Sequence, residues 1–347
     1  MKKVEVLDCT IRDGSYVING QWTPQEISNL TKELAENQFK YIEVGNGVGL
    51  GAHRRGVESI CTDEEYIELA VAEKGNSLIG TFFIPGIGNK DDIKLLSERG
   101  GDFIRIGTDV SKSDSAKEYI SYAKDLGLEV GYNFMKSYVV TPFELCKRAA
   151  RIQEFGADMI SLVDSAGGML PDEVGSYMQS LKECLSVRVG FHGHNNLLIA
   201  NANNISAINN GADIIDTTLM GMGRGAGNAQ TESMLVILEK MGIDVPMDPI
   251  KVSNISKKYI SPKTQMLKGS DDLQLVLGYA QFHDSYLNVI NEASDKFGID
   301  YRILIIEVSK INKENPSKEL IETIAEQLGS GNPVKIFYPK FHHKKMR

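Results

Sequence analysis

Short apolar runs rich in β-branched residues alternate with longer stretches of helical periodicity from the N-terminus to about residue 242. The apolar runs lack a clean alternation of apolar and polar positions, which is typical of strands buried on both faces. A capping residue followed by proline marks helix starts at Thr23-Pro24 and Thr141-Pro142, and Pro171 begins another helix. We expect eight strands, at Val4–Asp8, Tyr41–Val44, Leu78–Phe83, Phe103–Gly107, Glu129–Phe134, Met159–Val163, Val187–Phe191 and Ile214–Thr217.

Eight strand–helix units favour a parallel sheet with right-handed crossovers. Eight strands also close a TIM (β/α)8 barrel, which is the fold class that we predict. A doubly wound open sheet competes with it, because strand counting alone does not exclude that architecture. Beyond residue 246 the expected elements are all helical, at Pro249–Tyr259, Asp271–Phe297, Tyr301–Asn312 and Ser317–Gln327. We therefore divide the α/β chain into a barrel, 1–245, and a C-terminal helical module, 246–347, which ends in a basic tail from His342 to Arg347.

The composition narrows the classes of partner. The chain has 347 residues and a formal net charge of -8, so we expect no nucleic-acid partner, which would need a basic face. It has no run of about 18 apolar residues and no apolar stretch after the charged N-terminus, so we expect neither a membrane span nor a signal peptide. We expect a soluble, cytoplasmic protein. Scattered cysteines without a C-x-x-C pair predict reduced thiols at Cys9, Cys61, Cys146 and Cys184.

Two motifs lie where predicted strands end. Arg12 and Asp13 follow the first strand, and His192 and His194 end the seventh. In extended chain, residues i and i+2 point to the same side, so both imidazoles can face one point. With a distant carboxylate they form a set of two nitrogens and one oxygen that leaves positions open on a divalent metal. We choose Asp13 as that carboxylate because strands one and seven are near neighbours across a closed barrel mouth. Mn²⁺, Mg²⁺, Co²⁺ and Zn²⁺ all suit these ligands. A surface ion pair is the alternative for Arg12 and Asp13.

Further candidates lie at other strand ends. The segment Gly221–Asn228 can be matched to a relaxed dinucleotide fingerprint, but that fingerprint belongs after the first strand of a βαβ unit. We expect a loop whose backbone approaches the substrate, with Asn228 as a helix cap in the alternative. A nucleotide-dependent dehydrogenase would instead bind NAD tightly. Ser165 can donate to a carboxylate, and Asp164 can accept from a histidine. Arg105 fits an ion pair in the barrel interior.

The order of the motifs resembles that of the 4-hydroxy-2-oxovalerate aldolases, within the wider metallolyase group of the HMG-CoA lyases and isopropylmalate synthases. The resemblance covers the whole barrel and continues weakly into Leu277–Ala280. The motifs that carry it are Thr10–Gly14, Ile42–Gly45, Pro85–Gly88, Val163–Gly167, His192–Asn196 and Gly221–Ala229.

This resemblance implies a metal-dependent (class II) aldolase that cleaves a 4-hydroxy-2-oxo acid to pyruvate and an aldehyde through a metal-bound pyruvate enolate. It implies that Asp13, His192 and His194 hold the metal, usually Mn²⁺ in this family. Arg12 would stabilise the enolate oxygen, and Ser165 would bind the carboxylate of the keto acid. The helical module would dock an acylating aldehyde dehydrogenase. We also expect the protein to be an oligomer.

Two positions depart from the family pattern. The family has a histidine base two residues after the glycine of the Arg-Asp-Gly motif, where this chain has Tyr16. It has a tyrosine four residues after the Tyr279 position, where this chain has His283. A phenol of pKa about 10 is a poor base at neutral pH, whereas an imidazole of pKa about 6.5 is well matched. Our hypothesis is that His283 supplies the base and Tyr16 orients the substrate. The expected catalytic residues are Arg12, Tyr16 and His283, and the expected substrate contacts are Arg12, Asp13, Ser165, His192 and His283.

Two other functions stay open. A related carbon–carbon lyase or synthase that acts on a sugar acid or an acyl-CoA would share the superfamily motifs. An inactive scaffold subunit of an aldolase–dehydrogenase complex would keep the helical module. Such a subunit would have no reason to retain Arg12, Asp13, His192 and His194 together.

Overall fold

The computed structural model describes residues 3–264 and 272–329 and confirms a closed barrel of eight parallel strands. The strands pair in chain order, and β8 closes onto β1 with Glu5 opposite Ile214 and Asp8 opposite Thr217. This closure excludes the open doubly wound sheet. All eight predicted strands are present, with small shifts at their ends: β1 (Glu5–Asp8), β2 (Tyr41–Val44), β3 (Leu78–Phe83), β4 (Phe103–Asp109), β5 (Glu129–Met135), β6 (Met159–Asp164), β7 (Arg188–Gly193) and β8 (Ile214–Thr217).

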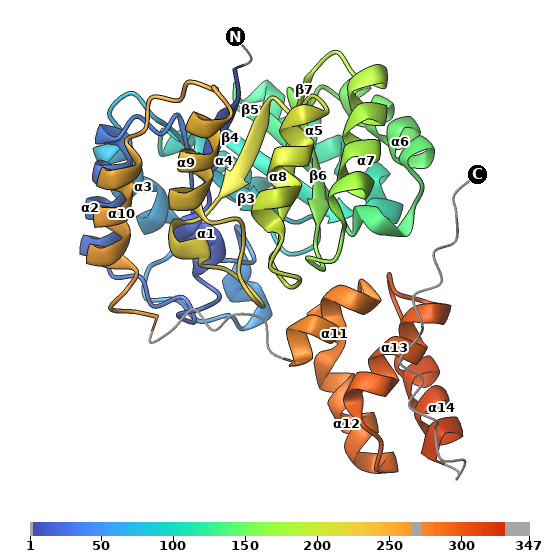
Figure 1. Ribbon diagram of the computed structural model, residues 1–347. Coiled ribbons are helices and arrows are strands. Elements are labelled where there is room, and N and C mark those ends of the chain that lie inside the picture. Colours follow the sequence, from blue (N-terminus) through green and yellow to red (C-terminus); the bar gives the residue numbers. More distant parts are fainter. Residues whose placement is uncertain (1–2, 265–271, 330–347) are drawn as a thin grey trace.

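Helices surround the barrel (Figure 1). The predicted caps at Thr23 and Thr141 are confirmed, since their side chains accept the backbone N–H of Glu26 and Glu144. The helices are α1 (Thr10–Gly14), α2 (Pro24–Glu36), α3 (Asp63–Glu73), α4 (Lys90–Glu98), α5 (Lys117–Asp125), α6 (Pro142–Glu154), α7 (Pro171–Cys184), α8 (Ala200–Asn209), α9 (Thr231–Lys240), α10 (Pro249–Tyr259), α11 (Asp272–Ala280), α12 (Leu287–Phe297), α13 (Tyr301–Ile311) and α14 (Lys318–Gly329). Short 3₁₀ helices are η1 (Ala52–Arg55), η2 (Val110–Ala116), η3 (Ser137–Val139), η4 (Leu219–Gly221) and η5 (Asp284–Tyr286).

The barrel interior changes from apolar to ionic along its axis. One small buried cluster combines residues from several strands, among them Leu7, Phe103 and Met159. Arg105 lies two residues further along β4 than Phe103 and so points to the same side, one layer closer to the carboxyl ends of the strands. Its side chain is fully buried and pairs with Glu43. The ion-pair alternative for Arg105 is therefore the one that the fold adopts.

The C-terminal helices pack in two ways. Helix α10 packs on the barrel and contributes Val252, Ile255 and Tyr259 to the main core. Helices α11–α14 enclose a hydrophobic cluster of their own and form a separate group at one end of the barrel (Figure 1). The domain division at 245/246 stays a prediction. We call α11–α14 with η5 the helical module from here on.

The predicted continuous helix Asp271–Phe297 is wrong. Its first residue lies outside the described residues, and the helix is interrupted between Ala280 and Leu287. Gln281 adopts a left-handed conformation with φ 48°, which an α-helix cannot continue. The turn that follows carries Phe282 into the core of the helical module and presents His283 and the residues after it to the barrel.

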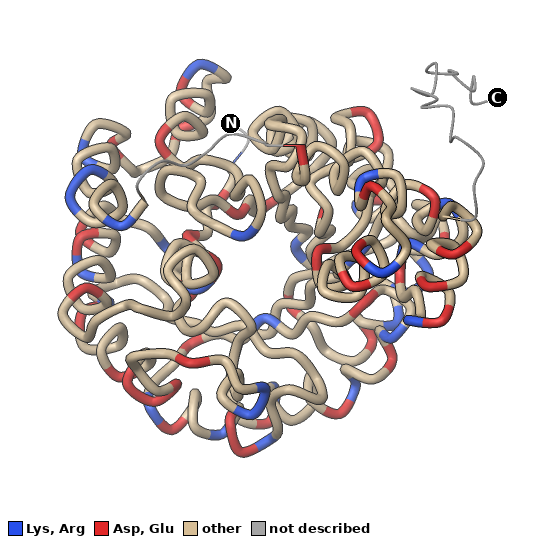
Figure 2. Tube along the Cα trace, turned by 90° about the horizontal axis from the view of Figure 1, so that it is seen from below, with Lys and Arg blue, Asp and Glu red and all other residues tan. Residues whose placement is uncertain are grey.

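Two expectations concern the surface and the termini. No helix in the ranges 3–264 and 272–329 is long and apolar enough to cross a membrane. Figure 2 shows acidic and basic residues interspersed around the outer ring of helices. The predicted basic tail from His342 to Arg347 lies outside the described residues.

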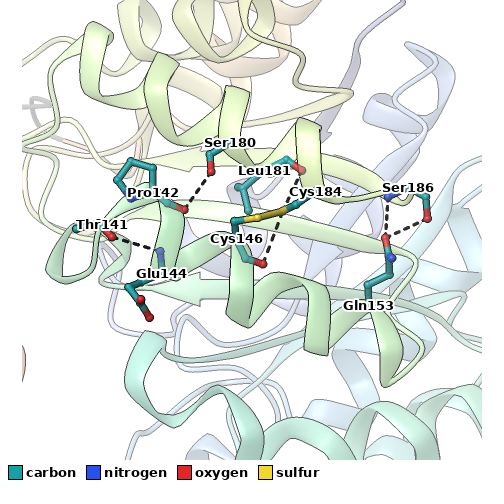
Figure 3. Close-up of a disulfide and its surroundings, with 9 residues drawn as sticks. All are labelled: Thr141, Pro142, Glu144, Cys146, Gln153, Ser180, Leu181, Cys184 and Ser186. Atoms are coloured by element: carbon teal, nitrogen blue, oxygen red, sulfur yellow. Dashed lines mark hydrogen bonds between the residues drawn. A yellow bond between two sulfur atoms is a disulfide. The ribbon is translucent and has the colours of Figure 1, made fainter.

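The prediction of four reduced thiols is wrong for one pair. Cys146 of α6 and Cys184 of α7 form a disulfide, with their Cα atoms 6.2 Å apart (Figure 3). Cys9 and Cys61 are free and buried. The paired cysteines are separated by 38 residues. They meet because consecutive barrel helices pack side by side, and no short-range cysteine motif announces such a contact.

Candidate metal and substrate site

A cavity of about 940 Å³ opens where the barrel strands end, the face that carries the active sites of this fold. We call it the mouth cavity. Seven of the residues that line it are the catalytic, substrate and metal candidates of the sequence analysis; six of these come from the barrel, and His283 comes from the helical module. The structure thus brings every residue nominated from the sequence into one cavity, while their roles stay predictions. These residues are Arg12, Asp13, Tyr16, Ser165, His192, His194 and His283.

Asp13, His192 and His194 form a group that could hold a metal ion. One ligand atom from each lies within 4.8 Å of the other two, and all three side chains are buried. Nε2 of His192 is 4.0 Å from Oδ2 of Asp13. Burial opposes ionisation of Asp13, but Arg12 and then the two histidines hold the pKa of this carboxyl below its usual range. An ionised carboxylate is the form that binds a cation.

The contacts of the two histidines fit metal ligation. Nδ1 of His192 lies 2.8 Å from Oδ2 of Asp216, which orients the ring and leaves Nε2 on the side of Asp13. Nδ1 of His194 is buried without a hydrogen-bond partner, and a native structure rarely leaves a buried polar atom unsatisfied. Burial, and then Arg224, lower the pKa of His194 well below 6.5, so the imidazole is neutral. Its Nε2 accepts from NH2 of Arg224 at 3.2 Å, and a metal bound at Nε2 would replace this contact. Two imidazoles and a carboxylate suit a divalent transition metal.

A second group, Cys9, His192 and Asp216, meets the same distance limit. Burial raises the pKa of the Cys9 thiol well above 9.0, so this residue is not the thiolate that metals bind. Asp216 is already paired with Arg105 and His192. The group that contains Asp13 is therefore the better metal site.

Sequence analysis missed Asp216. It lies in β8, where it accepts from Arg105 and contacts His192. Burial opposes its ionisation, but Arg105 and then His192 lower the pKa of Asp216 below its usual range. Its one sequence signal is a carboxylate within an otherwise apolar strand, because a buried charge requires a partner. Asp216 thus joins the ionic interior of the barrel to the candidate metal group.

Arg12 is held from two sides beside the metal group. It is 5% exposed, and it donates from Nε to Oε2 of Glu43 at 2.6 Å and from NH1 to Oδ1 of Asp13 at 2.8 Å. The guanidinium carbon lies 4.9 Å from the centroid of the Phe82 ring. Glu43 also accepts from Nε and NH2 of Arg105 at 2.7 and 2.6 Å. One buried carboxylate therefore joins two arginines and fixes the direction of Arg12.

The glycine-rich segment after β8 returns to the metal group, as expected for a close-approach loop. Asn228 donates from Nδ2 to Oδ2 of Asp13. The alternative role of Asn228 as a helix cap is wrong, because Gln230 occupies the N-cap of α9. A Cβ at Gly223 would lie 2.5 Å from Nδ2 of Asn228 and 3.1 Å from Oδ2 of Asp13. Only glycine permits this approach to the candidate ligand.

Within residues 3–264 and 272–329 the Asp164 carboxylate contacts no histidine side chain, so its expected role as an acceptor for one is wrong. Its carboxylate accepts the backbone N–H groups of Gly168 and Met169 at 3.2 and 2.9 Å. Burial raises the pKa of Asp164 to about 6, and these bonds oppose the rise. The neighbouring Ser165 faces the mouth cavity, and its Oγ accepts the backbone N–H of Lys136 at 2.9 Å. The hydroxyl proton of Ser165 is therefore available to a substrate.

Arg224 and Lys136 line the mouth cavity and had no role assigned from the sequence. Arg224 pairs with Asp284 of the helical module and donates from NH2 to the carbonyl oxygen of Ser165 at 2.9 Å. Lys136 donates from Nζ to the carbonyl oxygen of Glu314 at 2.8 Å. Both side chains thus link the barrel to the helical module. Contacts of this kind leave no local sequence pattern.

Tyr16 and His283 meet the same cavity in different protonation states. Tyr16 is 39% exposed as a whole residue. Burial of its hydroxyl group raises the pKa of the phenol above 10.0. Burial, then Arg224 and Lys136, lower the pKa of His283 well below 6.5. Nδ1 of His283 lies 2.9 Å from Oγ of Ser285 and 3.3 Å from Oδ1 of Asp284. Nδ1 also accepts the backbone N–H of Ser285 at 3.1 Å, so the neutral ring carries its proton on Nε2 in this arrangement.

Comparisons with known proteins give a consistent result. A family model described as HMGL-like matches residues 3–258. A 4-hydroxy-2-oxovalerate aldolase from Carboxydothermus hydrogenoformans is 33% identical over 333 residues, which cover 95% of this chain and 99% of the relative. Another, from Brevibacillus brevis, is 36% identical over 328 residues, which cover 94% of this chain and 96% of the relative.

The fold also has a counterpart among solved structures. The carboxyl transferase domain of Rhizobium etli pyruvate carboxylase is similar with a TM-score of 0.76 and 17% identity. The match covers 94% of this chain and 60% of that one. At this identity the likeness shows the shared barrel fold alone.

Proposed function

The chain belongs to the HMGL-like family, and on that premise we propose that it is a divalent-metal-dependent aldolase. It cleaves a 4-hydroxy-2-oxo acid to pyruvate and an aldehyde, or condenses the two in reverse. The observation that carries this proposal is the meeting of Asp13, His192 and His194 beside Arg12 in one buried cavity. Relatives named 4-hydroxy-2-oxovalerate aldolase, similar over nearly the full chain, support it.

In this proposal Asp13, His192 and His194 hold the metal, which we take to be Mn²⁺. When bound, the cation supplies Lewis-acid stabilisation of negative charge on the 2-oxo acid. Asp216 orients His192 through Nδ1, and Asn228 orients Asp13 through Oδ2. Such supporting contacts keep ligand geometry constant through a reaction.

Arg12 stabilises the oxygen on which charge develops when the C3–C4 bond breaks. Glu43 and Asp13 raise the pKa of its guanidinium above 12.5 against the effect of burial, so Arg12 stays charged. A fixed positive group at the developing enolate oxygen lowers the barrier without reorganisation. Ser165 donates its hydroxyl proton to the carboxylate of the keto acid.

In cleavage His283 takes the proton from the C4 hydroxyl as the C3–C4 bond breaks, and C3 of the enolate then takes up a proton from solvent to give pyruvate. Condensation runs both proton transfers in reverse, with His283 returning its proton to the aldehyde oxygen. The lowered pKa of His283 keeps the imidazole neutral at neutral pH. As the base, His283 carries its ring proton on Nδ1, which faces Oδ1 of Asp284 at 3.3 Å, and it accepts the substrate proton on Nε2. The phenol of Tyr16 stays protonated because its pKa is raised. Tyr16 therefore donates a hydrogen bond that orients the substrate.

Three further parts of the proposal rest on the sequence and stay predictions. They are the docking of an acylating aldehyde dehydrogenase on the helical module, an oligomeric state, and a cytoplasmic location. Co-purification with such a dehydrogenase, followed by light scattering of the separated protein, would test the first two.

The reaction is tested by incubating the protein with pyruvate and a panel of aldehydes, in Mn²⁺ or in EDTA, and detecting products by mass spectrometry. We expect hydroxy-oxo acids with Mn²⁺, loss of product in EDTA and recovery when excess Mn²⁺ is added. His194→Ala should abolish turnover, whereas His53→Ala should retain it, since the His53 side chain is 68% exposed and does not line the mouth cavity. Turnover of an acyl-CoA without pyruvate would favour the lyase or synthase alternative. Absence of any turnover would favour the scaffold.

A further inference from the structure

The mouth cavity is larger than pyruvate and a short aldehyde require. Its volume of about 940 Å³ lies near the upper end of the roughly 300–1,000 Å³ found for pockets that hold drug-sized ligands. Part of its lining comes from the ends of β4 and β5 and from the helical module, away from the metal-ligand motifs in sequence. We call this part the lysine wall; it consists of Asp109, Lys112, Asn133, Lys136, Tyr286 and Asn315.

The lysine wall carries a cation without a partner. Lys112 lies in η2 with its side chain exposed, and within ranges 3–264 and 272–329 no carboxylate pairs with its amino group. The remaining cationic side chains of the mouth cavity are each matched by a carboxylate that also lines it: Arg12 by Asp13, Lys136 by Asp109, and Arg224 by Asp284. Lys112 is therefore surplus positive charge at a cavity in a chain whose net charge is -8.

A buried acceptor lies in the same wall. Asn133 of β5 is 2% exposed, and its Oδ1 is buried without a hydrogen-bond partner among the residues that the structure describes. A hydroxyl group of a bound molecule would satisfy it. Lys136 is held from the other side by Tyr286 OH at 3.3 Å and by Glu314. The lysine wall thus combines the Lys112 ammonium, which no described carboxylate pairs with, the unsatisfied Oδ1 of Asn133 and the Lys136 side chain, which its own contacts hold in place.

We propose that the aldehyde half of the substrate is hydroxylated and carries an anionic group, a phosphate or a carboxylate, that Lys112 binds. This inference rests on the proposed function, because only an aldolase divides its substrate into a keto-acid half and an aldehyde half. Arg12 and the metal group hold the keto acid, so a second anion needs a second cation. A lysine ammonium binds phosphate or carboxylate by a charge-assisted hydrogen bond, and Asn133 accepts from a hydroxyl of the same aldehyde.

Matched aldehydes test the substrate class. Condensation with pyruvate is measured for glyceraldehyde 3-phosphate against glyceraldehyde, and for succinic semialdehyde against butyraldehyde. We expect the higher kcat/KM for the charged member of at least one pair, and the pair that shows it distinguishes a phosphate from a carboxylate. Lys112→Gln should lower kcat/KM for that charged aldehyde on the order of fivefold more than for its neutral match. Lys117→Gln is the control, since Lys117 is also exposed but lies outside the cavity lining, and it should change neither value.

A binding measurement separates this inference from the proposed function. Calorimetry compares glycerol 3-phosphate and succinate with glycerol, on the wild type and on Lys112→Gln. Binding of either anion that weakens in Lys112→Gln supports the anionic subsite even if no aldehyde turns over, a result that would overturn the proposed aldolase alone. Aldol turnover with equal kcat/KM for charged and neutral aldehydes, together with anion binding that is absent or indifferent to Lys112→Gln, would overturn the inference and leave the aldolase standing.

Discussion

The surroundings of Tyr16 and His283 shift the pKa of each side chain and so set its protonation state at neutral pH. The phenol has its pKa raised and stays protonated, while the imidazole has its pKa lowered and stays neutral. His283 reaches the mouth cavity because Gln281 ends the regular path of α11. One left-handed residue thus brings a base candidate from the helical module to a site built on the barrel.

The His283→Ala and Tyr16→Phe variants should differ in turnover. Loss of a general base costs roughly 10²–10⁴-fold in rate, so we expect a fall of that size in kcat for His283→Ala. Tyr16→Phe removes one hydrogen bond and should lower kcat by about tenfold or less. Steady-state cleavage of the 4-hydroxy-2-oxo acid measures both, and added imidazole should partly restore His283→Ala. A larger loss in Tyr16→Phe would reverse the assignment.

At the scale of elements, each strand–helix unit buries its own apolar face, and neighbouring units add contacts between helices. Helices α6 and α7 are joined by the disulfide between Cys146 and Cys184, while the backbone carbonyl of Pro142 accepts from Ser180 at 3.1 Å (Figure 3). These contacts link the beginning of one helix to the body of the next. The disulfide therefore stabilises a pair of units that the barrel has already aligned.

Reduction should destabilise this pair. A cross-link that closes a loop of this length lowers the conformational entropy of the unfolded chain and raises the free energy of unfolding by about 3–4 kcal/mol. The midpoint of urea unfolding of the wild type should therefore shift to a lower urea concentration in dithiothreitol. Cys146→Ser should resemble the reduced wild type and show no further change with reductant. Cys61→Ser is the control, because Cys61 is free, and it should keep the sensitivity. An unchanged wild-type midpoint in dithiothreitol would show that the cross-link does not contribute.

At the scale of the whole molecule, the barrel interior and the candidate metal group form one ionic network. Arg105 contacts Glu43 and Asp216, and these carboxylates contact Arg12 and His192. Desolvation makes buried charges costly unless they are paired. The network is complete only in the closed barrel. Binding of a cation by Asp13, His192 and His194 should therefore be coupled to folding of the whole barrel domain.

Mn²⁺ should therefore raise the unfolding temperature. A ligand at a hundred times its Kd stabilises the folded state by about 2.7 kcal/mol, which corresponds to about 5 °C for a domain of this size. Differential scanning fluorimetry in Mn²⁺ or EDTA measures the shift. Asp13→Asn should remove it, and Asp114→Asn, which changes an exposed carboxylate, should retain it. Equal shifts in both variants would place the stabilising ion elsewhere.

The pattern of strands and helices predicted eight strand–helix units and nominated most of the candidate site, and the closure of the sheet then excluded the doubly wound alternative. Strand patterns, helix caps and the His192–His194 spacing are local features. They follow from the burial and the side-chain direction of residues close in sequence, so they can be recognised from the sequence. The tertiary structure decided which distant groups support them. The contacts of Asp216 with His192, of Lys136 with the helical module and of Cys146 with Cys184 join residues of different elements. Contacts across such separations in sequence arise from packing and charge pairing in three dimensions, and no local pattern encodes them.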